Sequence, residues 1–91
     1  MSALGGWLIV IVMAYFVYII KNLKNNIYIG QTNNLDDRIK RHNNNTEKYT
    51  KNKGPFGLIY SEKFATRAEA MKREKMLKFG KGREWIRNNL L

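Results

Sequence analysis

The chain has 91 residues, which is the length of one small domain. It carries 17 Lys and Arg against 7 Asp and Glu, a formal net charge of +10, and it contains no cysteine. The lack of cysteine excludes a disulfide framework and thiolate metal sites of the zinc-finger type, and the surplus of positive charge favours a polyanionic partner.

The chain begins with an uncharged block, residues 1–20. The 18 residues from Ala3 to Ile20 are mostly apolar, and they reach the lower end of the roughly 17–25 residues that span a bilayer. Lys21 and Lys24 follow the block, so an anchor here would leave the rest of the chain in the cytoplasm.

A second interpretation divides this block, with translation starting at Met13. Residues 15–20 are rich in aromatic and β-branched side chains, which is typical of a buried strand. We favour this interpretation. It predicts an apolar extension over residues 1–12, a domain over residues 13–91 and a cytoplasmic location, with a membrane anchor through residues 1–20 as the alternative.

The charged part of the chain opens with a hairpin pattern. Residues 22–26 are polar and Asn-rich, and apolar runs on both sides predict strands near 15–21 and 26–31. The segment 32–34 then offers a helix N-cap, and acidic residues follow it in the expected first turn. A strand pair followed by a helix is therefore expected.

The second half of the sequence predicts a loop, a strand and two helices. Residues 43–57 are polar and read as the loop, and residues 58–60 form a short strand. Thr66 and Glu69 fit a capping box, so a helix of about 12 residues should follow and end at Gly80. A last helix is expected over residues 83–90, with Trp85, Ile86 and Leu90 facing the core. The expected fold is α+β, a small three-stranded antiparallel sheet flanked by helices in the order β-β-α-β-α-α.

Glu74 is the most informative single position. It falls on the apolar stripe that Ala70, Met71 and Leu77 form, where a carboxylate is costly unless it is paired or bound to a metal. The alternative is a glutamate at the edge of the stripe, paired with Lys78 one turn further along.

A second candidate group combines a helix face with several tyrosines. Arg38 and His42 are four residues apart and share one face, which suits phosphate binding and proton transfer, although a solvated basic face has the same spacing. Tyr18 and Tyr28 lie on the two paired strands, and Tyr49 lies in the basic loop. Strand tyrosines are also common as half-buried core residues with a hydrogen-bonded hydroxyl.

Several segments in order resemble one known family. They are Phe16-Val17-Tyr18, Ile27-Tyr28-Ile29-Gly30, Arg38 with His42, Glu47-Lys48-Tyr49-Thr50, Arg73-Glu74-Lys75-Met76-Leu77-Lys78 and Gly80-Lys81-Gly82-Arg83-Glu84. Over about residues 15–91 the chain resembles the GIY-YIG endonucleases, in their small stand-alone bacterial form. The first motif departs from the family name, because Phe16 and Val17 stand in place of Gly and Ile.

The resemblance implies roles for individual side chains. The catalytic set would comprise Tyr18 as general base or water-orienting phenol, Tyr28 on the phosphate or the water, Arg38 on transition-state charge, His42 as proton relay and Glu74 as ligand of a single Mg²⁺ or Mn²⁺ ion. Tyr49 would be an auxiliary contact, and so would Asn89, with Asn88 as its rival.

The expected function follows from these roles. The chain would be a divalent-metal-dependent endonuclease that hydrolyses DNA, with RNA as another candidate substrate. It would recognise the structure of the DNA rather than its sequence, because 91 residues leave little surface for base contacts, and it would serve in repair, recombination or processing. The alternative is a non-catalytic basic nucleic-acid-binding module on the same fold.

Overall fold

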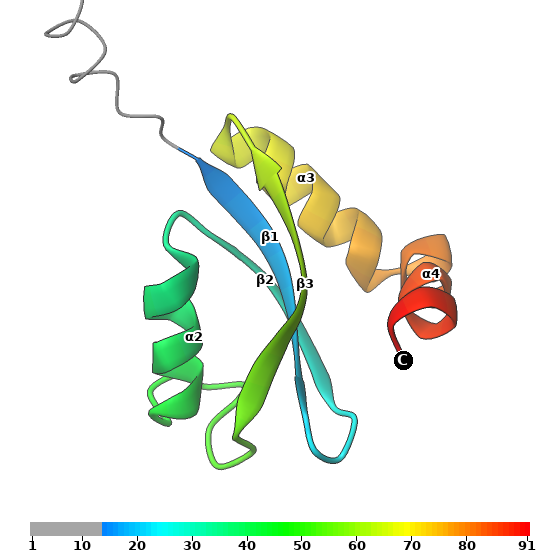
Figure 1. Ribbon diagram of the computed structural model, residues 1–91. Helices are drawn as coiled ribbons and strands as arrows, with labels where there is room; N and C mark the ends of the chain where they lie inside the picture. Colours follow the sequence, from blue (N-terminus) through cyan, green and yellow to red (C-terminus); the bar gives the residue numbers. More distant parts are fainter. Residues whose placement is uncertain (1–13) are drawn as a thin grey trace, which may run out of the picture.

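The computed structural model describes residues 14–91. The elements are β1 (Tyr15–Asn22), β2 (Ile27–Thr32), α2 (Leu35–Asn43), β3 (Phe56–Phe64), α3 (Arg67–Lys78) and α4 (Gly80–Leu90). The strands form one antiparallel sheet in the order β2-β1-β3. Helix α2 covers one face of this sheet, and α3 lies against the other face with α4 at its end (Figure 1). The predicted α+β fold is confirmed.

The central strand β1 supplies both cores of the domain. Its side chains alternate between the two faces, as the pleat requires. Val17 and Ile19 pack with residues of α3 and α4, whereas Tyr18 and Ile20 pack toward α2. All four are fully buried, which explains why this stretch of sequence has no polar alternation.

The N-terminal interpretations are decided in part. Residues 15–20 lie within β1, so the strand that we predicted there is confirmed. Within residues 14–91 no helix is long and apolar enough to cross a membrane. The extension predicted over residues 1–12 lies outside the described residues, and the cytoplasmic location stays a prediction.

Local chemistry starts two helices where the sequence predicted. The side chain of Asn34 caps α2 by accepting a hydrogen bond from the Asp37 backbone amide at 3.1 Å. Thr66 and Glu69 form the predicted capping box at the start of α3. These caps satisfy amide groups that would otherwise lack a partner in the first turn of each helix.

Two element boundaries and two side-chain orientations differ from the prediction. β3 runs from Phe56 to Phe64 instead of 58–60, because it pairs with β1 along that strand's whole length. α4 begins at Gly80, whose φ of +51° lets the chain turn directly out of α3. Met71 is 44% exposed and Trp85 is 36% exposed, so neither is the core residue we expected.

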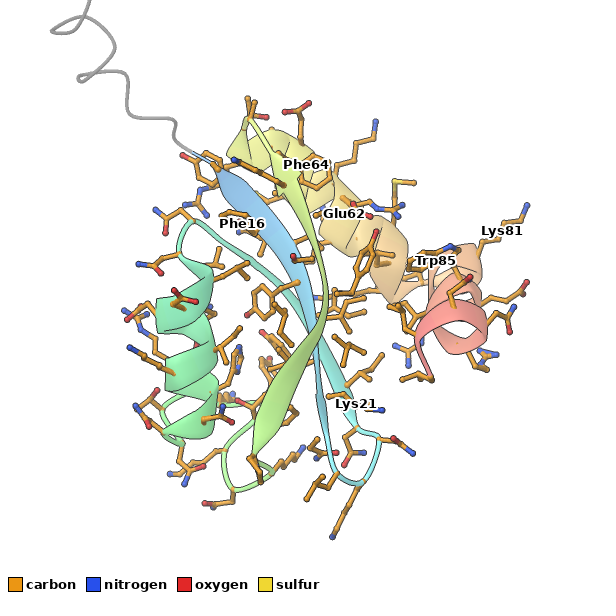
Figure 2. The ribbon with its side chains drawn as sticks, viewed as in Figure 1. Phe16, Lys21, Glu62, Phe64, Lys81 and Trp85 are labelled. Atoms are coloured by element: carbon orange, nitrogen blue, oxygen red, sulfur yellow. The ribbon has the colours of Figure 1, made fainter. Side chains whose placement is uncertain are left out.

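Side-chain contacts join β3 to the helices on its side of the sheet. Arg73 of α3 donates two hydrogen bonds to the carboxylate of Glu62, at 2.9 and 3.0 Å, and Tyr60 donates to the same carboxylate. Trp85 packs edge-on against Tyr60, with ring centroids 5.2 Å apart. Figure 2 shows Glu62 and Trp85 on this side of the sheet.

The turn between α3 and α4 gives a first prediction, on Gly82. A Cβ atom there would lie 2.7 Å from the Leu77 Cα and would collide with the Met76 carbonyl oxygen. Gly82→Ala should therefore destabilise the fold by about 1–3 kcal/mol, as overpacking against backbone does. Urea unfolding measures the change. Gly57→Ala is the control, because a Cβ there meets nothing within 4 Å, and equal stability of the two variants would contradict the explanation.

Candidate active site

The central pair of the candidate site joins β1 to α2. The Tyr18 hydroxyl lies 2.8 Å from His42 Nε2, and the contact is buried. Both side chains are fully buried. His42 is therefore not part of a solvated basic helix face, which was one of the two readings that its spacing allowed.

Tyr18 fits against β2 because of the residue opposite it. Gly30 is its partner in the antiparallel register. A Cβ atom at position 30 would lie 2.5 Å from the Tyr18 hydroxyl oxygen. Only glycine leaves space for the ring here, so Gly30 shapes the site without contributing a functional group.

Aromatic contacts extend the pair toward the surface. The Tyr28 ring lies beside His42, with centroids 4.7 Å apart. Tyr49 stacks on Tyr28 at 6.5 Å and is 68% exposed. A hollow of about 580 Å³ opens here, lined among others by Tyr28, Tyr49, Lys53 and Arg83. Aromatic rings and cations around one hollow suit a nucleic-acid strand.

Burial keeps both partners of the central pair neutral. Desolvation raises the pKa of Tyr18, Tyr28 and Glu47 raise it further, and the charge and hydrogen bonding of Arg38 oppose the increase. Desolvation lowers the pKa of His42, against a smaller opposite effect of Glu47. At neutral pH the pair is thus a phenol beside an imidazole that is free to accept a proton.

The charged residues of the site are held in ion pairs. Arg38 lies 3.2 Å from the Glu47 carboxylate, and both side chains are about a third exposed. Glu74 pairs with Lys78 at 2.6 Å, which is the alternative that its spacing allowed. Burial raises the pKa of Tyr28, while the charge of Lys78 lowers it and that of Glu74 raises it.

The residues predicted for the site therefore fall into three groups. The structure brings together four of them from β1, β2 and α2, namely Tyr18, Tyr28, Arg38 and His42. Tyr49 extends this group, whereas Glu74 lies on α3 at the other face of the sheet, where its partner Lys78 lines a hollow together with Tyr28. Asn89 is exposed and its amide donates to the Trp85 carbonyl of its own helix, at 2.8 Å. Asn88 is exposed as well.

Two residues near the site had no role predicted from the sequence. Thr50 lies 2.7 Å from His42 Nδ1, and Glu47 neutralises Arg38. Both belong to the polar loop before β3, where periodicity carries no information about contacts. The signal that could have found them is the short segment 47–50, which already resembled the bacterial relatives.

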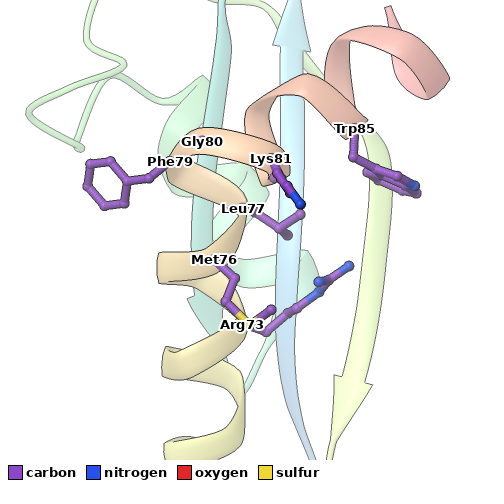
Figure 3. Close-up of a pocket in the computed structure, with 8 residues that line it drawn as sticks. Arg73, Met76, Leu77, Phe79, Gly80, Lys81 and Trp85 are labelled. Carbon is purple, nitrogen blue, oxygen red and sulfur yellow. The ribbon is translucent and has the colours of Figure 1, made fainter.

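A second hollow lies away from this cluster. It has a volume of about 410 Å³ and is lined by residues between Arg73 and Trp85, from α3, α4 and their junction (Figure 3). None of the residues predicted for the site lines it. It is smaller than the hollow of about 580 Å³ beside Tyr28 and Tyr49.

Comparison with known proteins decides the family. The model of the GIY-YIG catalytic domain matches residues 14–87. The chain belongs to the GIY-YIG family. The matched range includes the two tyrosine motifs that resembled the family, on β1 and β2, and the family indicates a nuclease domain that acts on nucleic acid.

Similar bacterial proteins extend this GIY-YIG assignment. A UPF0213 protein of Clostridium perfringens is 47% identical over 64 residues, which cover 69% of each chain. One from Staphylococcus haemolyticus is 43% identical over 65 residues, 70% of this chain and 79% of that protein. The solution NMR structure of a UPF0213 protein from Bacillus halodurans matches with a TM-score of 0.51 and 33% identity over 84% of both chains.

The buried imidazole predicts how stability changes with pH. The unfolded chain takes up a proton at His42 as the pH falls through about 6.5, whereas the folded chain does so only at lower pH. The unfolded state then binds more protons, so the free energy of unfolding should decrease from pH 7.0 to 5.5. The charged or titratable groups around His42 are Tyr18, Tyr28, Arg38 and Glu47.

Urea unfolding at the two pH values measures this dependence. His42→Gln serves as the control, because it removes the titrating group and should flatten the dependence. A wild-type stability that is constant or rises toward pH 5.5 would show that the imidazole is not held neutral.

Proposed function

We propose that this protein is a divalent-metal-dependent endonuclease that hydrolyses DNA phosphodiester bonds. The observation that carries the proposal is the buried hydrogen bond between the Tyr18 hydroxyl and His42 Nε2, with Arg38 beside it, in a chain of the GIY-YIG family. A phenol in contact with a neutral imidazole is a route for removing a proton from an attacking water.

The first part of the mechanism is proton transfer. Tyr18 takes the proton of the water that attacks phosphorus, and it passes its own hydroxyl proton to His42 Nε2. This exchange avoids a free phenolate, which the raised pKa of Tyr18 disfavours. Burial lowers the pKa of His42, so at neutral pH the ring is unprotonated and the Nε2 lone pair is available for that proton.

The second part is stabilisation of the phosphate. The Arg38 guanidinium can meet two oxygens of the reacting phosphate when it leaves Glu47, and such charge-assisted contacts strengthen as charge develops on those oxygens. Tyr28 lies between Tyr18 and Tyr49, where its hydroxyl can donate to the same phosphate. Tyr49 offers an exposed ring for a neighbouring base.

The donors available for a metal suit a hard cation with few protein ligands. Within residues 14–91 no group of three His, Cys, Asp or Glu side chains gathers in one place. A lone carboxylate such as Glu74 fits Mg²⁺ or Mn²⁺, since Mg²⁺ keeps several waters and takes phosphate oxygens as ligands. When bound there, the ion would supply positive charge to the phosphate.

The substrate follows from the small size of the domain. With 91 residues and a net charge of +10, the surface offers many contacts to phosphates and few to bases. We therefore propose a structural feature of DNA as the target, in repair, recombination or processing, with RNA as the competing substrate. A non-catalytic nucleic-acid-binding module is the rival, because in the free protein Arg38 and Glu74 are both paired and Tyr18 is buried.

Cleavage of branched and linear DNA tests the proposal. Wild-type protein should cut with Mg²⁺ or Mn²⁺ and stop in EDTA. Tyr18→Phe should lower the rate by about 10²-fold or more, because it removes the acid–base hydroxyl and keeps the ring. Glu74→Gln should lower it similarly and raise the metal concentration that is needed.

A matched control is Glu84→Gln, which removes an exposed carboxylate of α4 and should cut like the wild type. Binding without cleavage by any of these proteins would establish the rival. Cleavage that persists in EDTA and in both site variants would come from a contaminant. The same assay with RNA of identical structure separates the two substrates.

The Arg38–Glu47 ion pair gives a separate prediction about affinity. Glu47→Gln releases the guanidinium, so DNA binding should tighten, and the salt dependence of log K should steepen by about one released ion. Fluorescence anisotropy over a series of salt concentrations measures both quantities.

Asp37→Asn is the control for this effect, because it frees Arg41 from a more exposed pair on the same helix. Equal changes in the two variants would mean that only net charge matters. They would contradict a specific contact between Arg38 and phosphate.

A further inference from the structure

Thr50 is a buried polar residue in a loop that is otherwise mostly exposed. It is 1% exposed, and its hydroxyl oxygen lies 2.7 Å from His42 Nδ1. The other ring nitrogen, Nε2, is the one that meets Tyr18 at 2.8 Å. The imidazole is thus held at both nitrogens, by a strand on one side and by a loop on the other.

The loop is built so that Thr50 cannot easily move. Its backbone amide donates to the Glu47 carbonyl, and its carbonyl accepts from the Lys53 amide. At the base of the loop, the side-chain amide of Asn43 pairs with both backbone groups of Phe56, at 2.7 and 3.0 Å. These hydrogen bonds fix the position of the Thr50 hydroxyl relative to the imidazole ring of His42.

Two arrangements of the protons satisfy these contacts. In the first, Nδ1–H donates to the Thr50 oxygen and Nε2 accepts from the Tyr18 hydroxyl. In the second, Thr50 donates to Nδ1, and Nε2–H points at the oxygen of Tyr18. Only the first leaves Nε2 free to take a proton from Tyr18.

We propose that Thr50 is a positioning residue for the reaction, which holds His42 in the Nδ1–H tautomer with Nε2 directed at Tyr18. This role rests on the proposed nuclease function. The threonine does not touch the substrate in the proposed mechanism. It acts by accepting a hydrogen bond, so that the only histidine of the chain can serve as an acceptor at its other nitrogen.

The tautomer can be read directly, without activity. His42 is the only histidine in the sequence, so the imidazole nitrogens of uniformly ¹⁵N-labelled protein give one unambiguous pair of signals. Wild-type protein at neutral pH should show the Nδ1–H tautomer. A spectrum dominated by the Nε2–H tautomer would overturn the proposal.

Two substitutions separate the hydroxyl from the methyl group. Thr50→Val keeps the shape and removes the acceptor, so the buried ring should change to the Nε2–H tautomer, and cleavage should fall by about 10²-fold. Thr50→Ser restores the acceptor and should restore both the Nδ1–H signal and cleavage to within a few fold. Thr46→Val is the control in the same loop, because that hydroxyl bonds the Arg41 carbonyl instead.

The readouts distinguish this inference from the nuclease proposal. A folded Thr50→Val protein that keeps the Nδ1–H tautomer overturns the positioning role, whatever the wild type cleaves. A valine variant that loses activity while its serine counterpart also fails in both readouts points to packing and overturns it as well. If the tautomer responds as expected but wild-type protein cuts no nucleic acid, the proposed function fails and the hydrogen-bonding role of Thr50 stands.

Discussion

The close approach of β1 to β2 at one residue pair determines the geometry of the site. Tyr18 lies over Gly30, its register partner, and a single added carbon would meet the hydroxyl at 2.5 Å. Over this glycine the Tyr18 hydroxyl meets His42 of α2, at 2.8 Å. The register of β2 and the position of α2 therefore both determine where the Tyr18 hydroxyl lies. A shift of β2 by one residue would replace Gly30 with a residue whose side chain would occupy the space of the Tyr18 ring.

Asparagine side chains hold the irregular segments that surround this phenol. Asn22, the buried last residue of β1, donates to Asn26 and to the Lys53 carbonyl, and so links the hairpin turn to the long loop. Asn43 joins the end of α2 to the start of β3. These amides replace the backbone pairing that a sheet or helix would provide, so a loop with few apolar contacts still has a defined shape.

Much of the fold could be predicted because its signals are local. The hairpin turn, the Asn34 cap and the Thr66 capping box depend on side chains within a few residues of each other. The length of β3 could not be predicted, since pairing with β1 determines it. In the site, spacing grouped Arg38 with His42, but the burial of the histidine and its bond to Thr50 depend on a loop that has no periodic pattern.

The Arg38–Glu47 and Glu74–Lys78 ion pairs have a consequence for what the site can recognise. Arg38 is neutralised by an acid and Glu74 by a base, so each group already has the charge that a ligand would bring. A lone anion can replace only Glu47, and a lone cation can replace only Lys78. In the proposed mechanism the phosphate would take the place of Glu47 at Arg38, and a cation held by Glu74 would take the place of Lys78. The site would then bind a metal ion and a phosphate together more strongly than it binds either one alone.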